Sequence, residues 1–392
     1  MNPLAQKIKE AFIKRYKSEP GIYFSPGRIN LIGEHIDYND GYVMPCAINK
    51  GMYFAVSPNG KKDVSIFSRD YQEECKVSLT SVAPDEGWKN YVLSVINEFQ
   101  KDGKVLEGFN CLFGANVPSG AGLSSSAALE GGLAFALNDI FSLGYNPKQL
   151  ALLCQRAEHG FPQVNCGIMD QFANMLGKEG SVILLDCKDH VHSYLPLNPG
   201  DYRIVLINTK VHHALAASAY NTRRTECETG LKIIRENTPF KSFRDVHNSK
   251  LLQKLEDKMG KYVWKRCTYV VDEIQRTLLA AKFLKKGKLK DFGTLMFKSH
   301  EGLSELFKVS CAELDFLVKV AEGYPGVIGA RMMGGGFGGC TINIVHKDNK
   351  EAFVATSLDK YKKEFQSVAE SYDVVTADGT HLVTEDESGN QK

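Results

Sequence analysis

Residues 25–39 hold the densest group of side chains that could bind a small polar molecule. Glu34, His35 and Asp37 supply several hydrogen-bond acceptors and donors, which a polyhydroxylated ligand needs. Arg28 adds a fixed positive charge with planar donors, which suits a phosphate or a carboxylate. The residues alone leave two interpretations open, a ligand-binding loop and a polar surface turn.

Residues 117–127 combine small residues with three consecutive serines. They follow an expected strand over 108–117 and open an expected helix over 124–140. Small residues let a ligand approach the backbone closely, and N–H groups at a helix N-terminus attract anions. The GxxxxGK[ST] pattern of the P-loop is missing. The segment therefore indicates either a phosphate-binding loop of another type or an ordinary strand–turn–helix junction.

A third group, residues 334–339, satisfies the pattern GxGxxG. A dinucleotide-binding fold requires a strand before this pattern and a helix after it. Residues 340–345 instead alternate like a strand, so we reject that interpretation.

The rest of the chain must supply the elements that position these groups. The pattern predicts helices over 4–17, 148–159, 166–176, 220–235 and 263–286, and strands over 42–58, 63–68, 181–186 and 203–208. This mixed order is typical of an α+β architecture. The change to a strongly helical texture divides the chain into domains at 1–190 and 191–392, and the last dozen residues look like a polar tail.

Composition excludes several classes of protein. Lys+Arg 48 against Asp+Glu 46 leaves a formal net charge of +2, which does not attract nucleic acid or an anionic membrane. The ten cysteines are scattered without a CxxC pair, and no stretch approaches the roughly 20 apolar residues of a membrane span. The N-terminus lacks the apolar core of a signal peptide. We therefore expect a cytoplasmic monomer that binds neither nucleic acid nor membrane.

The three groups, in this order, resemble the three motifs of the GHMP kinase superfamily, which includes galactokinase, homoserine kinase and mevalonate kinase. The stretch GRINLIGEHIDYNDGYVMPCAI is similar to the signature of the galactokinase family, and shorter matches begin at Trp88, Cys166, Leu184 and Tyr220. The resemblance covers about residues 20–345. It implies an ATP-dependent kinase that phosphorylates the 1-hydroxyl of galactose. It also implies a ribosomal S5 domain 2-like N-terminal domain, a ferredoxin-like C-terminal domain, and an active site between them.

The resemblance assigns roles to individual residues. Asp170 and Arg28 match the catalytic pair, in which Asp170 accepts the hydroxyl proton and Arg28 keeps Asp170 ionised and stabilises the transferring charge. The residues that match the sugar site are Glu34, His35, Asp37, Gly167, Asp170 and Tyr220. Without the resemblance, Asp170 in its apolar helical stretch would be read as a buried, salt-bridged carboxylate.

For the second substrate the resemblance implies ATP, with Mg²⁺ as the cofactor. The residues that match the ATP site are Trp88, beside the adenine, and the loop Pro118, Ser119, Gly120, Ala121, Gly122, Leu123, Ser124, Ser125 and Ser126. Ser126 and Glu158 match the magnesium ligands, and the choice among the three serines stays open. Gly335 and Gly336 match a loop that packs close to the phosphates and the sugar.

Two alternatives remain. A kinase of a related sugar, such as N-acetylgalactosamine, a uronic acid or arabinose, would share the fold, and Ile36 is compatible with the first of these. A non-catalytic sensor of galactose and ATP would belong to another class of protein. The intact serines at 124–126 together with Arg28 and Asp170 favour the enzyme, and residues 38–41 favour galactose. Met333 stands where threonine is usual, so a hydroxyl expected near the phosphates is missing.

Overall fold

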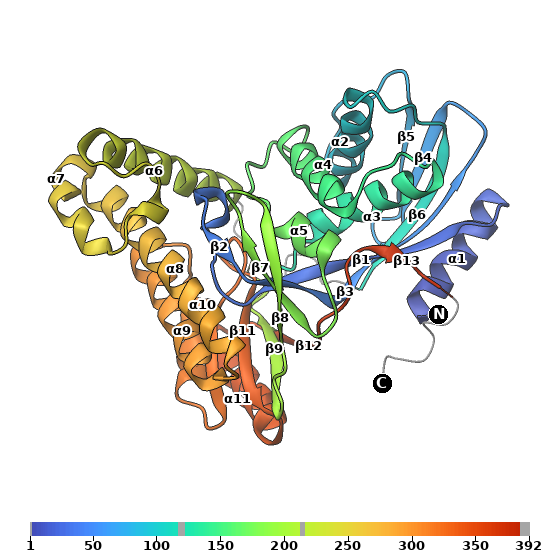
Figure 1. The fold of residues 1–392 in the computed structure, drawn as a ribbon. Coiled ribbons are helices and arrows are strands. Elements are labelled where there is room, and N and C mark those ends of the chain that lie inside the picture. Colours follow the sequence, from blue (N-terminus) through green and yellow to red (C-terminus); the bar gives the residue numbers. More distant parts are fainter. Residues whose placement is uncertain (1, 117–121, 212–215, 385–392) are drawn as a thin grey trace.

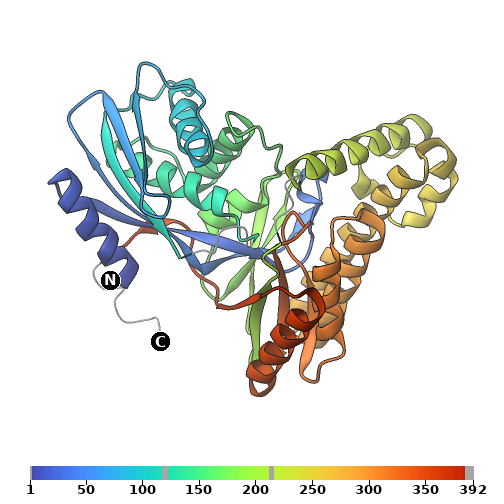
Figure 2. The same ribbon diagram turned by 180° about the vertical axis from the view of Figure 1, so that it is seen from behind.

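The computed structural model describes residues 2–116, 122–211 and 216–384, which form two halves (Figure 1). The blue-to-green half holds one large sheet with its helices, and the yellow-to-red half holds a second sheet and most of the other helices. From behind, the last described segment can be followed from the second half back to the first (Figure 2). The mixed set of helices and sheets confirms the predicted α+β class.

The first sheet has the strand order β13-β1-β3-β6-β4-β5, and only β4 and β6 run parallel. Its strands are β1 (Gly21–Asn30), β3 (Pro45–Pro58), β4 (Asp63–Ser68), β5 (Glu73–Ser78), β6 (Phe109–Ala115) and β13 (His381–Leu382). Successive side chains of a strand point to opposite faces. Ile22 and Phe24 accordingly pack with α1 (Pro3–Tyr16), whereas Tyr23 joins the core on the other face.

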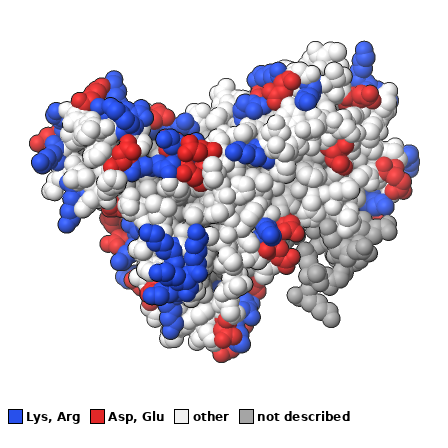
Figure 3. All heavy atoms as spheres, viewed as in Figure 1, with Lys and Arg blue, Asp and Glu red and all other residues white. Residues whose placement is uncertain are grey.

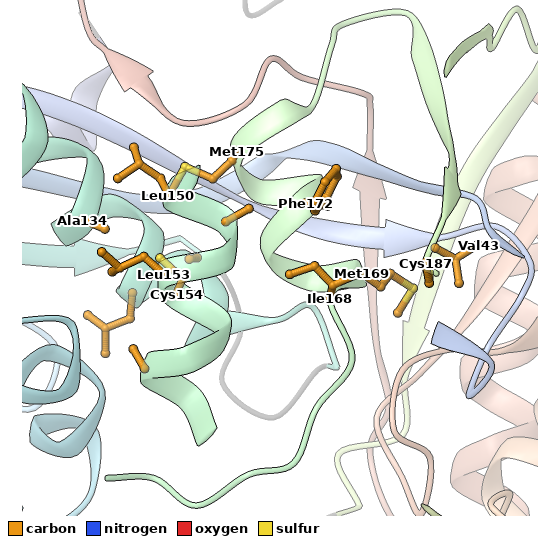
Figure 4. Close-up of a cluster of buried hydrophobic side chains, with 14 of the residues drawn as sticks. Val43, Ala134, Leu150, Leu153, Cys154, Ile168, Met169, Phe172, Met175 and Cys187 are labelled. Atoms are coloured by element: carbon orange, nitrogen blue, oxygen red, sulfur yellow. The ribbon is translucent and has the colours of Figure 1, made fainter. Parts of the chain in front are cut away.

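Four helices share the core on that other face. They are α2 (Trp88–Lys101), α3 (Ser125–Ile140), α4 (Pro147–His159) and α5 (Met169–Leu176). Figure 4 shows this core, in which Met169 at the start of α5 lies close to Val43 and Cys187, while Phe172 and Met175 belong to the same cluster. Both ends of α5 are therefore fixed by apolar packing.

The second half contains a four-stranded antiparallel sheet of order β10-β11-β9-β12, and a three-stranded sheet of order β2-β7-β8 contacts both β3 and the helix α8. The bounds are β2 (Tyr42–Val43), β7 (Ser181–Asp186), β8 (Val191–Pro196), β9 (Tyr202–Asn208), β10 (Val327–Met332), β11 (Cys340–His346) and β12 (Glu370–Val374).

The glycine motif at 334–339 is followed directly by the strand β11 and not by a helix. The rejection of a dinucleotide-binding fold is therefore confirmed.

The helices of this half are α6 (Ala216–Asn237), α7 (Glu256–Met259), α8 (Lys261–Lys285), α9 (Leu289–Glu301), α10 (Ala312–Glu322) and α11 (Lys350–Phe365). The helices from α8 to α11 cover both faces of the four-stranded sheet, whereas α6 and α7 pack against α8. Ile204 and Leu206 of β9 share a core with α8 and α9, whereas Val205 and Ile207 share one with α10 and α11. Short turns are η1 (Asp37–Asn39), η2 (Phe243–Asp245), η3 (Ser249–Leu255), the π-helical η4 (Gly302–Phe307) and η5 (Lys347–Asn349).

The end of the described chain returns to the first sheet. Ala377 N–H donates to the Ala47 carbonyl at 3.0 Å, and His381 and Leu382 pair with β1 as β13. The expected polar tail was therefore wrong for His381 and Leu382, which add an edge strand. The domain boundary near 190 stays a prediction.

The surface carries charged side chains of both signs, as the face in Figure 3 shows. Several exposed lysines follow one another between residues 282 and 290, where α8 ends and α9 begins. Among the described residues, none of the helices combines the length and apolar character that crossing a bilayer requires.

Candidate active site

A cleft of about 320 Å³ brings the predicted catalytic and sugar-binding residues together. This volume lies at the lower end of the range for small-molecule sites, which is roughly 300–1,000 Å³. The predicted residues that line it are Arg28, Glu34, His35, Asp37, Glu158, Gly167, Asp170, Tyr220, Gly335 and Gly336. They come from β1 and the loop after it, α4, the loop before α5, α5 itself, α6, and the loop after β10. Residues far apart in the sequence therefore form a single site.

Arg28 and Asp170 form a two-bonded ion pair in this cleft. Arg28 donates from Nε to Asp170 Oδ1 at 2.7 Å and from Nη2 to Oδ2 at 2.9 Å, and its Nη1 donates to the Gly122 carbonyl at 2.6 Å. Burial alone would lower the pKa of Arg28, but the charges of Asp170 and Glu34 raise it. The fork geometry holds the carboxylate in one orientation.

Ser124 also binds Asp170. Its backbone has a φ of 58°, and its hydroxyl donates to Asp170 Oδ2. A carboxylate has about four lone-pair positions, so these three donors leave one for a further proton donor. Because the Asp170 side chain is 26% exposed, that position can face the cleft. Ser124, expected on the ATP side, thus acts on the predicted base.

Glu34 is held from the other half of the chain. Its Oε2 accepts from Arg331 Nη2 at 2.8 Å and from the Gly334 N–H at 3.1 Å. Arg331 is fully buried and also donates to the carbonyls of Asn30, Leu31 and Met332. The loop after β1 and the end of β10 are therefore joined by one guanidinium.

His35 makes a second link between the same two loops. Its Nε2 donates to the Gly335 carbonyl at 3.1 Å, so its Nδ1 accepts from the Tyr38 hydroxyl at 2.8 Å. Burial lowers the pKa of His35 to about 3, so the imidazole is neutral. The Tyr220 ring packs against it with ring centroids 5.2 Å apart.

Asp37 lies against the backbone of Gly167. A Cβ at residue 167 would come within 1.9 Å of Asp37 Oδ2, so only glycine fits. Burial, followed by the charges of Asp170 and Glu34, raises the pKa of Asp37 to about 7. The sequence predicted a helix over 166–176, which would include this glycine, but α5 begins at Met169. Gly167 therefore lies in a loop that faces the cleft.

Glu158 and Ser126 are adjacent. The Ser126 hydroxyl hydrogen-bonds the Glu158 carboxyl, and Gln171 Nε2 donates to Glu158 Oε2 at 2.6 Å. Burial, followed by repulsion from Asp170, raises the pKa of Glu158 to about 7. Mg²⁺ prefers oxygen ligands and is commonly held by one or two carboxylates together with substrate phosphates and water. The pair therefore fits Mg²⁺, although no group of three or more His, Cys, Asp or Glu suited to a metal occurs among the described residues.

The ATP side is described only in part. Pro118, Ser119, Gly120 and Ala121 lie outside the described residues. Gly122 accepts from Arg28, Leu123 is buried, and Ser125 begins α3. The predicted adenine contact Trp88 packs edge-on against Phe113, with ring centroids 5.2 Å apart, and donates to Glu73 Oε2 at 3.2 Å. Its role stays a prediction.

Sequence reasoning missed several residues of the site. Arg331 and Gln171 act through Glu34 and Glu158, and Cys166 lines the cleft with its Sγ 3.4 Å from Glu158 Oε2. Arg331 stands just before the glycine motif, and Cys166 and Gln171 flank Asp170 within one matched stretch. Proximity to a motif was the only signal that could have identified them.

Three family models match parts of this chain. Residues 10–58 match the galactokinase galactose-binding signature, residues 90–178 match the GHMP kinases N terminal domain, and residues 280–363 match the GHMP kinases C terminal domain. The chain is 40% identical over 389 residues to the galactokinase of Clostridium acetobutylicum, which covers 98% of this chain and 99% of the relative. It is 37% identical over 359 residues to the galactokinase of Thermotoga neapolitana, covering 92% and 99%.

Solved structures with a similar fold belong to kinases of the same superfamily. The crystal structure of Lactococcus lactis galactokinase complexed with galactose matches with a TM-score of 0.93 and 34% identity, covering 96% of this chain and 99% of the other. The Methanococcus jannaschii mevalonate kinase matches with a TM-score of 0.61 at 17% identity, covering 92% and 100%, and shares the fold alone. The predicted two-domain GHMP kinase fold is confirmed.

Proposed function

This chain belongs to the galactokinase family of GHMP kinases and is a sugar kinase, and we propose that it phosphorylates the 1-hydroxyl of α-D-galactose with ATP. The products would be galactose 1-phosphate and ADP. The observation that carries the proposal is the Arg28–Asp170 ion pair in a cleft that also holds Glu34, His35 and Asp37. Transfer to a polyhydroxylated acceptor needs such a base, a fixed cation and several hydrogen-bonding groups.

Asp170 acts as the proton acceptor in this proposal. Its one remaining lone-pair position receives the proton of the sugar 1-hydroxyl as the oxygen attacks the γ-phosphorus. Arg28 and Ser124 hold the carboxylate still during this step. General-base help of this kind is worth roughly 10²–10⁴-fold in rate.

Arg28 has a second role. Its guanidinium is fixed by Asp170 and the Gly122 carbonyl, and in this proposal it stabilises the negative charge that develops on the transferring group. The loop 118–126 would cradle the ATP phosphates, with Trp88 beside the adenine. Ser126 and Glu158 would hold Mg²⁺, which neutralises phosphate charge when bound.

The sugar is held by hydrogen bonds in this proposal. Glu34 and Asp37 supply acceptors, and the neutral His35, Gly167 and Tyr220 shape the wall of the cleft. The sugar bound in the Lactococcus lactis relative is galactose, which supports the same substrate here.

The test is an ADP-release assay with MgATP and a panel of galactose, N-acetylgalactosamine, galacturonate, arabinose and glucose. We expect turnover on galactose, and a loss of roughly 10²–10⁴-fold in kcat for Asp170→Asn. Galactose binding, measured by calorimetry, should survive in that variant. Asp291→Asn, an exposed acid on α9, is the matched control and should retain activity.

Other outcomes would change the proposal. If the protein phosphorylated only another sugar of the panel, the proposed mechanism would stand and that sugar would replace galactose as the proposed substrate. Binding of galactose and ATP without turnover on any sugar would support a sensor instead of an enzyme. Activity of Asp170→Asn close to that of the wild type would contradict its role as the base.

We further propose that the protein acts in the cytoplasm as a monomer. All ten cysteines are free thiols, which suits a reducing compartment. The predicted catalytic and sugar-binding residues meet within a single copy of the chain, which fits a monomer. Fractionation of cells and light scattering of the purified protein test these two points.

A further inference from the structure

Two walls of the cleft come from different halves of the chain (Figure 1). One wall is the segment over residues 160–168, which joins α4 to α5 and is called the connecting loop below; it contributes Gly167. The other wall is the first part of α6, which contributes Tyr220 and Asn221. A sugar that contacts both Gly167 and Tyr220 needs these two walls to be held at a fixed separation.

The connecting loop is supported by its own half on one side only. It contains no helix or strand, and Asn165 is exposed. The Val164 N–H donates to the Glu158 carbonyl at 3.1 Å, and His159 Nε2 donates to the Cys166 carbonyl at 2.9 Å. Both of these bonds lead back to the end of α4. Irregular segments with exposed backbone and few buried contacts open at a low cost in free energy, so further support matters here.

Arg224 of α6 provides a bond from the other half. Its Nη1 donates to the Asn165 carbonyl at 2.8 Å, and its Nε donates to Glu228 Oε1 at 3.0 Å, one turn further along the same helix. Within the described ranges, no other hydrogen bond joins α6 to the connecting loop. Because Asn165 lies two residues before Gly167, this bond holds the stretch of backbone from which Gly167 faces the cleft.

The Arg224 guanidinium also lies over the ring of Tyr38, with its Cζ 5.9 Å from the ring centroid. This is close to the outer limit of a cation–π contact, which is about 6 Å. The Tyr38 hydroxyl donates to His35 Nδ1 at 2.8 Å, and the Tyr38 ring meets that of Tyr220 edge-on, with centroids 5.4 Å apart. Arg224 therefore contacts two of the segments around the cleft, although it does not itself line it.

We propose that Arg224 is a positioning residue for the sugar, which ties α6 to the connecting loop and so fixes Gly167 and Tyr38 around bound galactose. An arginine suits this role because its planar group can donate in several directions while it lies over an aromatic ring. This inference rests on the proposed function, in which the cleft binds galactose. The Arg224 side chain is 31% exposed and that of Glu228 is 62% exposed, so replacing Arg224 leaves no buried charge behind.

The test compares Arg224→Met with Arg224→Lys in the full chain. Methionine keeps an aliphatic stem and removes every donor, so both the KM and the calorimetric Kd for galactose should rise roughly tenfold. The kcat should stay within about twofold, because the variant weakens binding and leaves Arg28 and Asp170 unchanged. Lysine keeps one charged donor for the Asn165 carbonyl, so it should restore the KM to within about threefold of the wild type.

Arg235→Met is the matched control. Arg235 is an exposed residue of the same helix, about three turns beyond Arg224, and its Nε donates to the Lys241 carbonyl at 2.7 Å. It does not line the cleft. The control removes the same type of bond from α6, so an unchanged KM for galactose in Arg235→Met separates positioning from a general weakening of the helix.

Hydrogen exchange measures the connecting loop without any reaction. Peptides that cover residues 160–168 should exchange faster in Arg224→Met than in the wild type, and at the wild-type rate in Arg235→Met. If the wild type binds no galactose, the proposed function fails, and the exchange rates still decide whether Arg224 holds the loop. Unchanged exchange in Arg224→Met would overturn the inference. A lower kcat at constant KM would also overturn it, because Arg224 would then act in the transfer step.

Discussion

Replacing Arg331 by methionine tests the link between the two halves. The Arg331 side chain is fully buried, and its ion-pair partner Glu34 is 2% exposed. Methionine has similar length and no charge, so the variant removes the donors with little change in packing. Glu34 then keeps only the Gly334 N–H, and the carbonyls of Asn30 and Leu31 lose the Arg331 donor.

The expected cost follows from the buried charge that is left behind. Removing one partner of a buried ion pair costs about 3–5 kcal/mol. With an m-value of about 3 kcal/mol/M, this lowers the urea midpoint by roughly 1–2 M. Arg331→Met/Glu34→Gln removes the lone charge as well, so it should be more stable than Arg331→Met alone.

The assay is urea unfolding followed by circular dichroism, with calorimetry of galactose binding in parallel. Galactose affinity should fall in Arg331→Met because Glu34 is no longer fixed. Lys363→Met, which breaks an exposed pair with Asp359, is the control and should cost at most about 0.5 kcal/mol. A loss below about 1 kcal/mol in Arg331→Met, or a double variant less stable than the single one, would refute the reasoning.

Three further predictions concern the cleft itself. Ser124→Ala removes one donor from Asp170, so kcat should fall by roughly fivefold while the KM for galactose stays unchanged in steady-state assays; a change in KM alone would contradict this. Gly167→Ala places a Cβ within 1.9 Å of Asp37 Oδ2 and should raise the KM for galactose strongly, whereas Gly323→Ala, whose Cβ would come no closer than 3.9 Å to its neighbours, should not. Because the pKa of Asp37 is raised to about 7, its carboxylate form is lost below that pH, so the KM for galactose should fall as the pH rises through about 7. Asp37→Asn should bind galactose more weakly and lose this pH dependence; an unchanged profile would exclude Asp37 as its source.

The parts of the site that lie close together in sequence were predictable. Glu34, His35 and Asp37 belong to one short loop, so their types alone made a binding site for a polyhydroxylated ligand one of two interpretations. The alternating strand β4 and the short apolar strand β7 were also predicted at their observed bounds. Local chemistry and periodicity are sufficient for such features.

The parts that depend on tertiary contacts were not predictable. Arg331 meets Glu34 across 297 residues, and nothing in either segment specifies the other. Ser124 reaches Asp170 because of its left-handed backbone, which three consecutive serines do not reveal. Glu130 on α3 is fully buried, and the sequence around it contains no signal for this.

The return of residues 377–382 to the first sheet has a consequence for synthesis on the ribosome. Domains tend to fold in order as the chain emerges, N-terminal ones first. Here β1 gains its outer neighbour only when His381 and Leu382 have appeared, after the whole second half has been made. Until then one side of β1 is an unpaired edge that could bind other nascent chains. The first half can therefore begin to fold early, but its sheet is completed only when residue 382 has been added.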